Sequence, residues 1–211
     1  MCNNCNCGLK LRVQKTVPSA KIPSYAYDGD ACMDLSIAGI YDPESPNIII
    51  ANDETSFIIR HDELSSFVKK LLKEWDFSLE QEKKLINSIE KKDTGFCEFV
   101  VILPGETIVF DTGLIFDIPN GYEMKIYPRS SLGIKKNLEL ANTVGVIDST
   151  FRDSVRIALR NKSNLPVVIN RGERVVQMQL QKVLKIDIEE VSNINTDTTR
   201  GTKGTGSSGV L

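Results

Sequence analysis

The sequence is poor in the residues that most often carry nucleophilic chemistry. Only one of its 211 residues is a histidine, His61, whereas serine and cysteine nucleophiles are usually activated by a neighbouring histidine. His61 falls in a segment with helical periodicity, so we expect any catalysis to depend on carboxylates, arginines and backbone amides. No stretch of about 18 apolar residues is present, which predicts that the chain does not span a membrane.

Cysteine is scarce and odd in number. The five cysteines are Cys2, Cys5, Cys7, Cys32 and Cys97. The odd count, and an N-terminus without the apolar core of a signal peptide, predict reduced thiols and no secretion. We expect a cytoplasmic location, or another interior such as the nucleus or an infected host cell. The first three cysteines resemble a metal-binding cluster, but structural zinc needs a fourth ligand. We therefore interpret residues 1–8 as a flexible, cysteine-rich leader.

An excess of basic residues is also absent. Lysine and arginine total 26 against 28 aspartates and glutamates, which leaves a formal net charge of −2. Nucleic-acid-binding domains usually carry a basic face and a high isoelectric point, so the composition argues against a nucleic-acid partner. The chain also has no G-x-x-x-x-G-K-[ST] phosphate loop, which excludes the commonest nucleotide-binding motif.

Short apolar runs separated by turn residues dominate two regions, 9–40 and 95–190. Strands at intervals of about 8–12 residues with Pro-Gly, Asn-Gly and Arg-Gly turns are typical of all-β sandwiches and barrels. The runs of the second region are FCEFVVI, ETIVFDTGLIFDI, YEMKIYP, TVGVIDS, SVRIALRN, LPVVIN, RVVQMQL and KVLKIDIEEV. We predict an all-β domain of the jelly-roll type over residues 9–190.

The region between them has a different periodicity, and we interpret residues 41–95 as a helical insertion. From Asp62 to Trp75, apolar residues recur at i, i+3, i+4, i+7, i+8 and i+11, which makes one stripe along a helix. Ser78 and Gln81 match a capping box at the start of a second helix. We expect this hairpin to pack on the β-domain, and binding of a protein partner is the alternative.

The chain ends in RGTKGTGSSGVL, which contains a G-x-G-x-x-G pattern. In dinucleotide-binding folds this pattern follows a strand and opens a helix, but here only two residues follow it, so that interpretation fails. Glycine still allows backbone amides to approach an anion closely, and arginine binds phosphate bidentately. We predict that residues 191–211 form a flexible arm, which orders over a triphosphate if the β-domain supplies the rest of the site.

Two segments of the β-domain offer groups that bind phosphate oxygens. In YPRSSLG, Arg129 brings a guanidinium, Ser130 and Ser131 bring hydroxyls, and Gly133 closes the predicted turn. In RGERVVQMQL, Gln177 lies on a strand after a turn and brings a neutral donor. Together with loop amides, these are the donors expected of a phosphate site.

Carboxylates lie in two further segments. Asp148 follows the strand run of GVIDSTFRD, where it could activate a water molecule or hold a sugar hydroxyl. Asp28, Asp30 and Asp34 in AYDGDACMDLS are hard oxygen ligands that hold Mg²⁺ through water. The residues therefore predict a metal-assisted triphosphate site.

In this order, the segments DACMDLS, YPRSSLG, ANTVGVIDSTFRD, RGERVVQMQL and RGTKGTGSSG resemble the five motifs of the trimeric dUTPase family. The resemblance covers residues 10–40 and 100–209. It implies a distorted jelly-roll β-barrel, here with an inserted helical hairpin, that forms homotrimers with sites between subunits. It also implies hydrolysis of dUTP to dUMP and pyrophosphate with Mg²⁺, the arm of one subunit closing over the site of a neighbour.

The resemblance also implies a role for each motif residue. Asp148 would activate the attacking water and bind the deoxyribose 3′-hydroxyl, Phe151 would pack on the sugar in place of the family tyrosine, and Asp34 would orient the hydrated metal. The other predicted site residues are Asn142, Gly145 and Ile147 for the pyrimidine, Arg129, Ser130, Ser131, Gly133 and Gln177 for the phosphates, and Arg200, Thr205, Gly206, Ser207 and Ser208 in the arm.

Departures from the family pattern leave other functions open. Thr205 stands where the family has a phenylalanine that stacks on uracil, a contact worth about 1–3 kcal/mol, so one alternative is a pyrophosphatase for a modified pyrimidine deoxynucleotide. Deamination of dCTP is a second alternative, although the position of its catalytic glutamate is Arg152 here, with Asp153 next. A non-catalytic nucleotide-sensing module that binds a partner through the insertion is a third.

Overall fold

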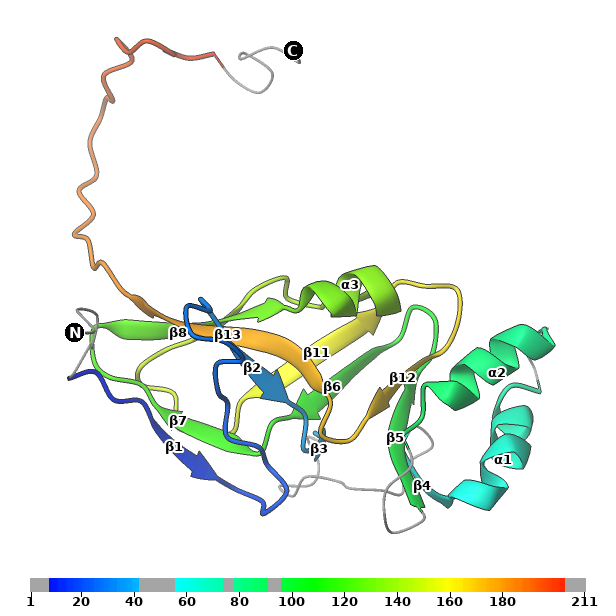
Figure 1. Cartoon of the computed structure of the whole chain (residues 1–211). Helices are drawn as coiled ribbons and strands as arrows, with labels where there is room; N and C mark the ends of the chain where they lie inside the picture. The colour runs from blue at the N-terminus through cyan, green and yellow to red at the C-terminus, as the bar shows by residue number, and fades with distance from the viewer. Residues whose placement is uncertain (1–7, 42–55, 74–77, 91–95, 204–211) are drawn as a thin grey trace.

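The computed structural model describes residues 8–41, 56–73, 78–90 and 96–203. Strands make up most of its regular structure, and two helices of the insertion lie together at one end of the molecule (Figure 1). Residues 1–7 of the predicted leader lie outside the described residues. Within the described ranges no helix is both long and apolar enough to cross a membrane.

Two four-stranded antiparallel sheets enclose the main core. One has the order β10-β8-β13-β2 and the other β3-β6-β11-β9. Their strands are β2 Met33–Ser36, β8 Tyr122–Pro128, β10 Gly145–Ile147 and β13 Arg174–Lys182, then β3 Gly39–Ile40, β6 Thr107–Asp111, β9 Leu138–Leu140 and β11 Arg156–Asn161. Successive strand residues point to opposite faces, so Met124, Met178, Phe110 and Leu159 meet in one fully buried cluster. Burial of this shared face holds the two sheets together.

A two-stranded sheet of β1 (Arg12–Lys15) and β7 (Leu114–Asp117) adjoins this core. The run predicted as one apolar segment divides into β6 and β7 around Gly113, whose φ of 67° lies in the left-handed region. A Cβ at this position would lie 2.8 Å from a methyl of Val17 and 2.9 Å from Ala20. Only glycine satisfies both the turn and the packing.

A third sheet, β12-β5-β4, lies between the main core and the insertion. It consists of β4 (Ser56–Arg60), β5 (Phe96–Ile102) and β12 (Val167–Asn170). Along β5, Val100 and Ile102 face the main core, whereas Phe99 and Val101 face the insertion. This double burial explains why the sequence of β5 is almost continuously apolar.

The helical insertion packs its apolar stripe on the outer face of the third sheet. A 3-10 turn (η1, His61–Glu63) leads into α1 (Leu64–Leu71), and α2 spans Leu79–Asn87. The Ser78 hydroxyl accepts a hydrogen bond from the Gln81 amide, and the Gln81 side chain accepts one from the Ser78 amide, so the capping box is confirmed. The second buried cluster is Leu64, Val68, Leu72, Leu85, Ile89, Phe99, Val101 and Val168. The stripe therefore belongs to the core, and Trp75 lies outside the described residues.

The predicted all-β fold with a helical hairpin is confirmed, with corrections in detail. The turn predicted to close at Gly133 is instead the helix α3, Ser130–Lys136, and β4 is a strand within the insertion that the helical interpretation misses. Among the described strands the ladders form four separate sheets, and none closes on itself. The molecule is thus a pair of packed sheets with additions at both ends.

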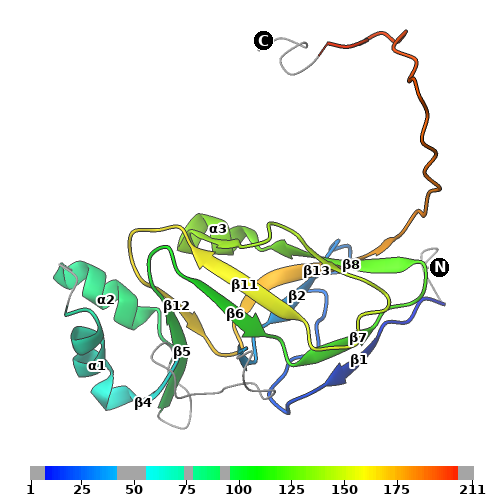
Figure 2. The same cartoon turned by 180° about the vertical axis from the view of Figure 1, so that it is seen from behind.

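The segment after β13 corrects another prediction. KVLKIDIEEV alternates as a strand does, yet β13 ends at Lys182 and residues 183–203 form neither strand nor helix. Its apolar side chains are largely exposed, at 83% for Leu184, 78% for Ile186 and 89% for Ile188. Figures 1 and 2 show this segment leaving the molecule at the end opposite α1 and α2. The prediction that the arm is flexible is not tested by this geometry.

Candidate active site

Three of the predicted motifs meet in one cleft beside β13. Strand register places Gln177 opposite Asp34 of β2 on one side and opposite Tyr127 of β8 on the other. A cleft of about 310 Å³ opens there, and its lining includes Asp30, Cys32, Asp34, Arg129, Ser130 and Gln177. Segments far apart in sequence therefore contribute to one polar cavity, because β13 pairs with both neighbours.

The Asp34 carboxylate is the centre of an ion-pair network in this cleft. Its Oδ1 lies 2.9 Å from Nε of Arg129, and its Oδ2 lies 3.0 Å from Nη1 of Arg174. Arg129 also donates through Nη1 to the carbonyl of Arg174, at 2.9 Å. The side chain of Asp34 is only 18% exposed, so the network fixes both guanidinium groups beside the cleft. Arg174, which the sequence-based prediction did not name, is part of this network.

The other phosphate-binding candidates lie around Arg129. Nε2 of the Gln177 side chain donates to the Pro128 carbonyl at 3.0 Å, which orients that side chain toward the end of β8. Ser130 is exposed and lines the cleft, and Ser131 is half-buried in the first turn of α3. Gly133 is exposed on the same helix and has open space around it. Three of these predicted residues, Arg129, Ser130 and Gln177, therefore line one cavity.

Cys32 brings a thiol into the cleft that sequence reasoning gave no role. Burial raises the pKa of this thiol above its ordinary value, and the neighbouring carboxylates Asp30 and Asp34 raise it further. The thiol is therefore neutral near pH 7 and a weak nucleophile.

The third motif lies at the opposite end of β8. Ile147 is the last residue of β10 and pairs with Met124 near the start of β8, whereas Arg129 follows the end of that strand. The seven residues of β8 span about 20 Å at roughly 3.3 Å per residue. Asp148 is exposed and follows Ile147 directly. One chain therefore holds Asp148 far from the cleft that contains Arg129.

A tight turn lies near the start of this motif. The Val144 amide donates to the Asn142 carbonyl at 2.6 Å, and the residue between them, Thr143, has a φ of 64°. A β-branched residue in this region is strained, and such strain is often found at functional sites. Gly145 then packs against Ile126 so closely that a Cβ would lie 3.1 Å from it. The exposed Asn142 is thus presented on a fixed backbone.

Phe151 and the two residues after it complete the loop. Phe151 is 37% exposed, as a ring that packs on a substrate would be. The Asp153 carboxylate pairs with Arg156 at 2.6 Å and accepts a hydrogen bond from the Ser154 amide. Arg152 stands at the position where a dCTP deaminase would have its catalytic glutamate, and its guanidinium pairs with the Asp117 carboxylate at 2.8 Å. Neither residue offers an unoccupied carboxylate for deamination.

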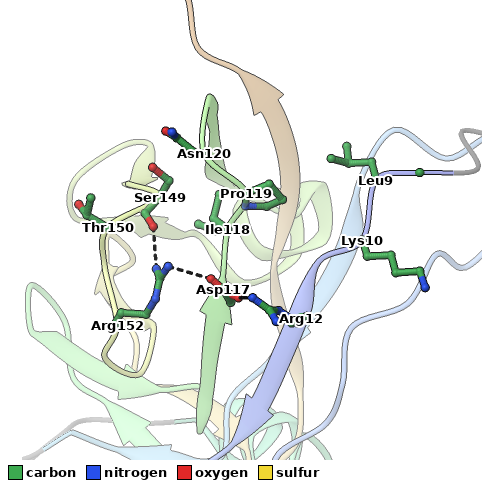
Figure 3. A pocket seen from close by; sticks show the side chains of 11 residues that line it. Leu9, Lys10, Arg12, Asp117, Ile118, Pro119, Asn120, Ser149, Thr150 and Arg152 are labelled. Atoms are coloured by element: carbon green, nitrogen blue, oxygen red, sulfur yellow. Dashed lines mark hydrogen bonds and ion pairs between the residues drawn. The ribbon is translucent and has the colours of Figure 1, made fainter.

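A second, larger cavity of about 660 Å³ lies beside this loop. Its lining includes Lys10, Arg12, Asp117, Asn120, Ser149 and Arg152 (Figure 3). In the arm, Arg200 donates through Nε to the Lys203 carbonyl at 3.2 Å. The predicted arm residues Thr205, Gly206, Ser207 and Ser208 lie outside the described residues.

The fold and the site define an antiparallel β-protein whose strands bring an arginine, an aspartate and a glutamine into one polar cleft. Comparison with known proteins supplies the family. The dUTPase family model matches residues 82–209. A deoxyuridine 5'-triphosphate nucleotidohydrolase from Hydrogenobaculum sp. is 38% identical over 117 residues, 54% of this chain and 81% of that protein. Another from Nautilia profundicola is 42% identical over 112 residues, 53% of this chain and 78% of that protein. The chain belongs to the dUTPase family.

Solved structures agree on the fold. A Staphylococcus bacteriophage 80alpha dUTPase with dUPNHPP aligns with a TM-score of 0.61 at 19% identity, covering 95% of this chain and 99% of that one. A mutant dUTPase from phage phi11 of S. aureus aligns with a TM-score of 0.55 at 16% identity, covering 88% and 98%. At this identity the likeness concerns the fold alone.

Proposed function

We propose that this protein hydrolyses dUTP to dUMP and pyrophosphate. The observation that carries the proposal is the joining of Asp34, Arg129 and Gln177 in one polar cleft, in a chain whose family is named for this reaction. A triphosphate brings about four negative charges, and the two arginines beside the cleft supply part of the balancing charge.

The reaction divides between two groups of residues. Arg129, Ser130 and Gln177 bind phosphate oxygens, with Ser131 and the backbone near Gly133 alongside. Asn142, with the backbone from Gly145 to Ile147, reads the pyrimidine edge, and Phe151 packs on the sugar. The side chain of Asp148 binds the 3′-hydroxyl and accepts a proton from the attacking water.

The chemical step balances without a covalent intermediate. The water oxygen forms a bond to the α-phosphorus while the bond from that phosphorus to the α–β bridging oxygen breaks. The proton of the water passes to Asp148, and the electron pair of the broken bond leaves with pyrophosphate. Because Asp148 also contacts the sugar, it lies on the α-phosphate side of the substrate.

The separation along β8 supports a site shared between copies of the chain. A phosphate bound at Arg129 lies about 20 Å from the Asp148 end of the strand, so a second copy must bring its Asp148 loop to the cleft. The exposed apolar side chains of Leu184, Ile186 and Ile188 likewise favour contact with another copy. We propose a homotrimer in which the arm of one subunit, through Arg200 and residues 204–208, closes the site of another.

Mg²⁺ fits this site as an ion carried by the substrate. In the described part of the chain no three acidic, histidine or cysteine side chains converge as metal ligands, and both oxygens of Asp34 are paired with arginines. Mg²⁺ keeps several waters and is usually held through substrate phosphates. When bound to the triphosphate it would neutralise charge on the leaving pyrophosphate, and Asp34 would contact its waters.

A second substrate is favoured by one residue of the sequence. Thr205 replaces the ring expected over uracil, which leaves room for a substituted base. We expect Thr205→Phe to tighten dUTP binding about tenfold if uracil is the natural base, measured by calorimetry with a non-hydrolysable analogue.

A protein partner at the insertion would have to bind its polar outer surface, because the apolar stripe is buried.

The direct test is pyrophosphate release with Mg²⁺ from dUTP, dCTP, dTTP and UTP. We expect release from dUTP, and little from UTP because the sugar contact of Phe151 excludes a 2′-hydroxyl. Ammonia from dCTP without pyrophosphate would indicate a deaminase, and no release from any nucleotide would indicate a binding module.

A further inference from the structure

The loop that carries Asp148 is held by a single arginine side chain. Nη1 of Arg152 donates to the carbonyl of Ser149 at 2.7 Å and to the carbonyl of Phe151 at 2.8 Å. The Phe151 amide donates to the Asp148 carbonyl at 3.1 Å, which closes a turn across the same residues. Arg152 therefore contacts the backbone on both sides of Thr150, within the segment that links Asp148 to Phe151.

The arginine is in turn fixed to a different strand. Its Nη2 lies 2.8 Å from Oδ1 of Asp117, the last residue of β7. Oδ2 of Asp117 pairs with Arg12 of β1, so the carboxylate is held from both sides (Figure 3). Asp117 is 33% exposed and Arg152 50% exposed. Through these contacts, the position of the loop from Asp148 to Phe151 is tied to the end of β7.

We propose that Asp117 and Arg152 are positioning residues that fix the loop from Asp148 to Phe151 in its working geometry. The inference rests on the proposed role of Asp148. A carboxylate that activates water must stay within hydrogen-bond reach of it, and a displacement of about 1 Å can cost up to 100-fold in rate. Because Asp148 itself is exposed, the arginine contacts restrain the loop in a way that burial of Asp148 does not.

A direct phosphate-binding role for Arg152 is the competing explanation, and the contacts disfavour it. Both terminal nitrogens of the guanidinium already donate to loop carbonyls or to Asp117. A phosphate could bind across the two terminal nitrogens only by displacing a partner, because Nη1 already uses both of its N–H groups. Loss of a phosphate ligand would weaken substrate binding, whereas loss of a positioning group lowers turnover and leaves binding intact.

The test compares kcat, KM and analogue binding for Asp117→Asn, Arg152→Lys and the parent chain. Asp117→Asn removes the charge at constant size, and Arg152→Lys keeps the charge but cannot bridge the carbonyls and Asp117 together. We expect kcat to fall about tenfold in each, KM to change less than twofold, and Asp117→Glu to restore part of the loss. Backbone amide exchange from Asp148 to Arg152 should also become faster. Glu139→Gln, which removes the exposed pair with Lys162, is the matched control and should keep the parent kcat.

Each other result overturns the inference. Unchanged kcat and unchanged amide exchange would show that the loop keeps its geometry without Asp117 and Arg152. A raised KM with unchanged kcat would make Arg152 a substrate ligand. A fall in kcat that tracks a lowered melting temperature in both variants would make the pair merely structural. Asp148→Asn, measured in parallel, separates the two proposals. If Asp148→Asn stays active, the proposed function fails. If Asp148→Asn is inactive while the Asp117 and Arg152 variants keep the parent kcat, only the positioning role of Asp117 and Arg152 fails.

Discussion

The distance between Asp148 and Arg129 along β8 leads to a prediction about mixed oligomers. Asp148→Asn and Arg129→Gln chains should each be nearly inactive, because each lacks one half of the site. Co-expressed with different tags and purified through both, they should regain activity. In a ring of three chains, each mixed assembly keeps about one site in three with both groups intact. The expected pyrophosphate release from dUTP is therefore about a third of the parent rate per assembly.

The control for this experiment is a mixture in which no chain carries the Asp148 carboxylate. Asp148→Asn chains are mixed with chains that carry both Asp148→Asn and Arg129→Gln, so that no intact Asp148 is present. This mixture should remain inactive. If the first mixture is as inactive as its parents, both groups act within one chain, and the reasoning from strand register is refuted.

Three further predictions concern the arm, the insertion and the cleft. Deleting residues 200–211 should lower kcat strongly without changing the melting temperature, because the described part of that arm is exposed; a fully active truncation would reject the closing arm. Ser78→Ala should lower the free energy of unfolding by about 1 kcal/mol in urea titrations, whereas Ser65→Ala on the exposed face of α1 should not; equal effects would deny the capping box its role. Iodoacetamide should modify Cys32 more slowly at pH 8 than a free cysteine, because burial and then Asp30 and Asp34 raise its pKa; peptide mapping that finds ordinary reactivity would contradict this.

Much of the fold follows from local pattern, and the segment after β13 shows what local pattern leaves out. FCEFVVI and YEMKIYP form β5 and β8 with the predicted bounds, because turn residues flank each run and the core covers its apolar face. KVLKIDIEEV has the same alternation, but in one chain its apolar residues remain exposed. Periodicity shows that a segment can form a strand, but the partner edge depends on tertiary or quaternary contacts.

In the candidate site, too, the residues could be predicted from the sequence but the contacts between them could not. The motif residues could be named from sequence because their chemistry and order are distinctive. The pairing of Asp34 with Arg174 depends on the register of β2 against β13, and Asp117 reaches Arg152 only because β7 ends beside the loop. Contacts between segments far apart in sequence are set by the folded sheets, and no motif spacing encodes them.

The measurement that tests the central claim most directly is dUTP hydrolysis by Asp148→Asn beside its binding of a non-hydrolysable dUTP analogue. Asparagine has almost the same shape as aspartate but cannot accept the proton of the attacking water. We expect pyrophosphate release to fall at least about 100-fold, the lower end of what a positioned general base contributes, with analogue affinity within a few fold of the parent. A variant that hydrolyses dUTP at the parent rate would contradict the assignment of Asp148 and the mechanism built on it.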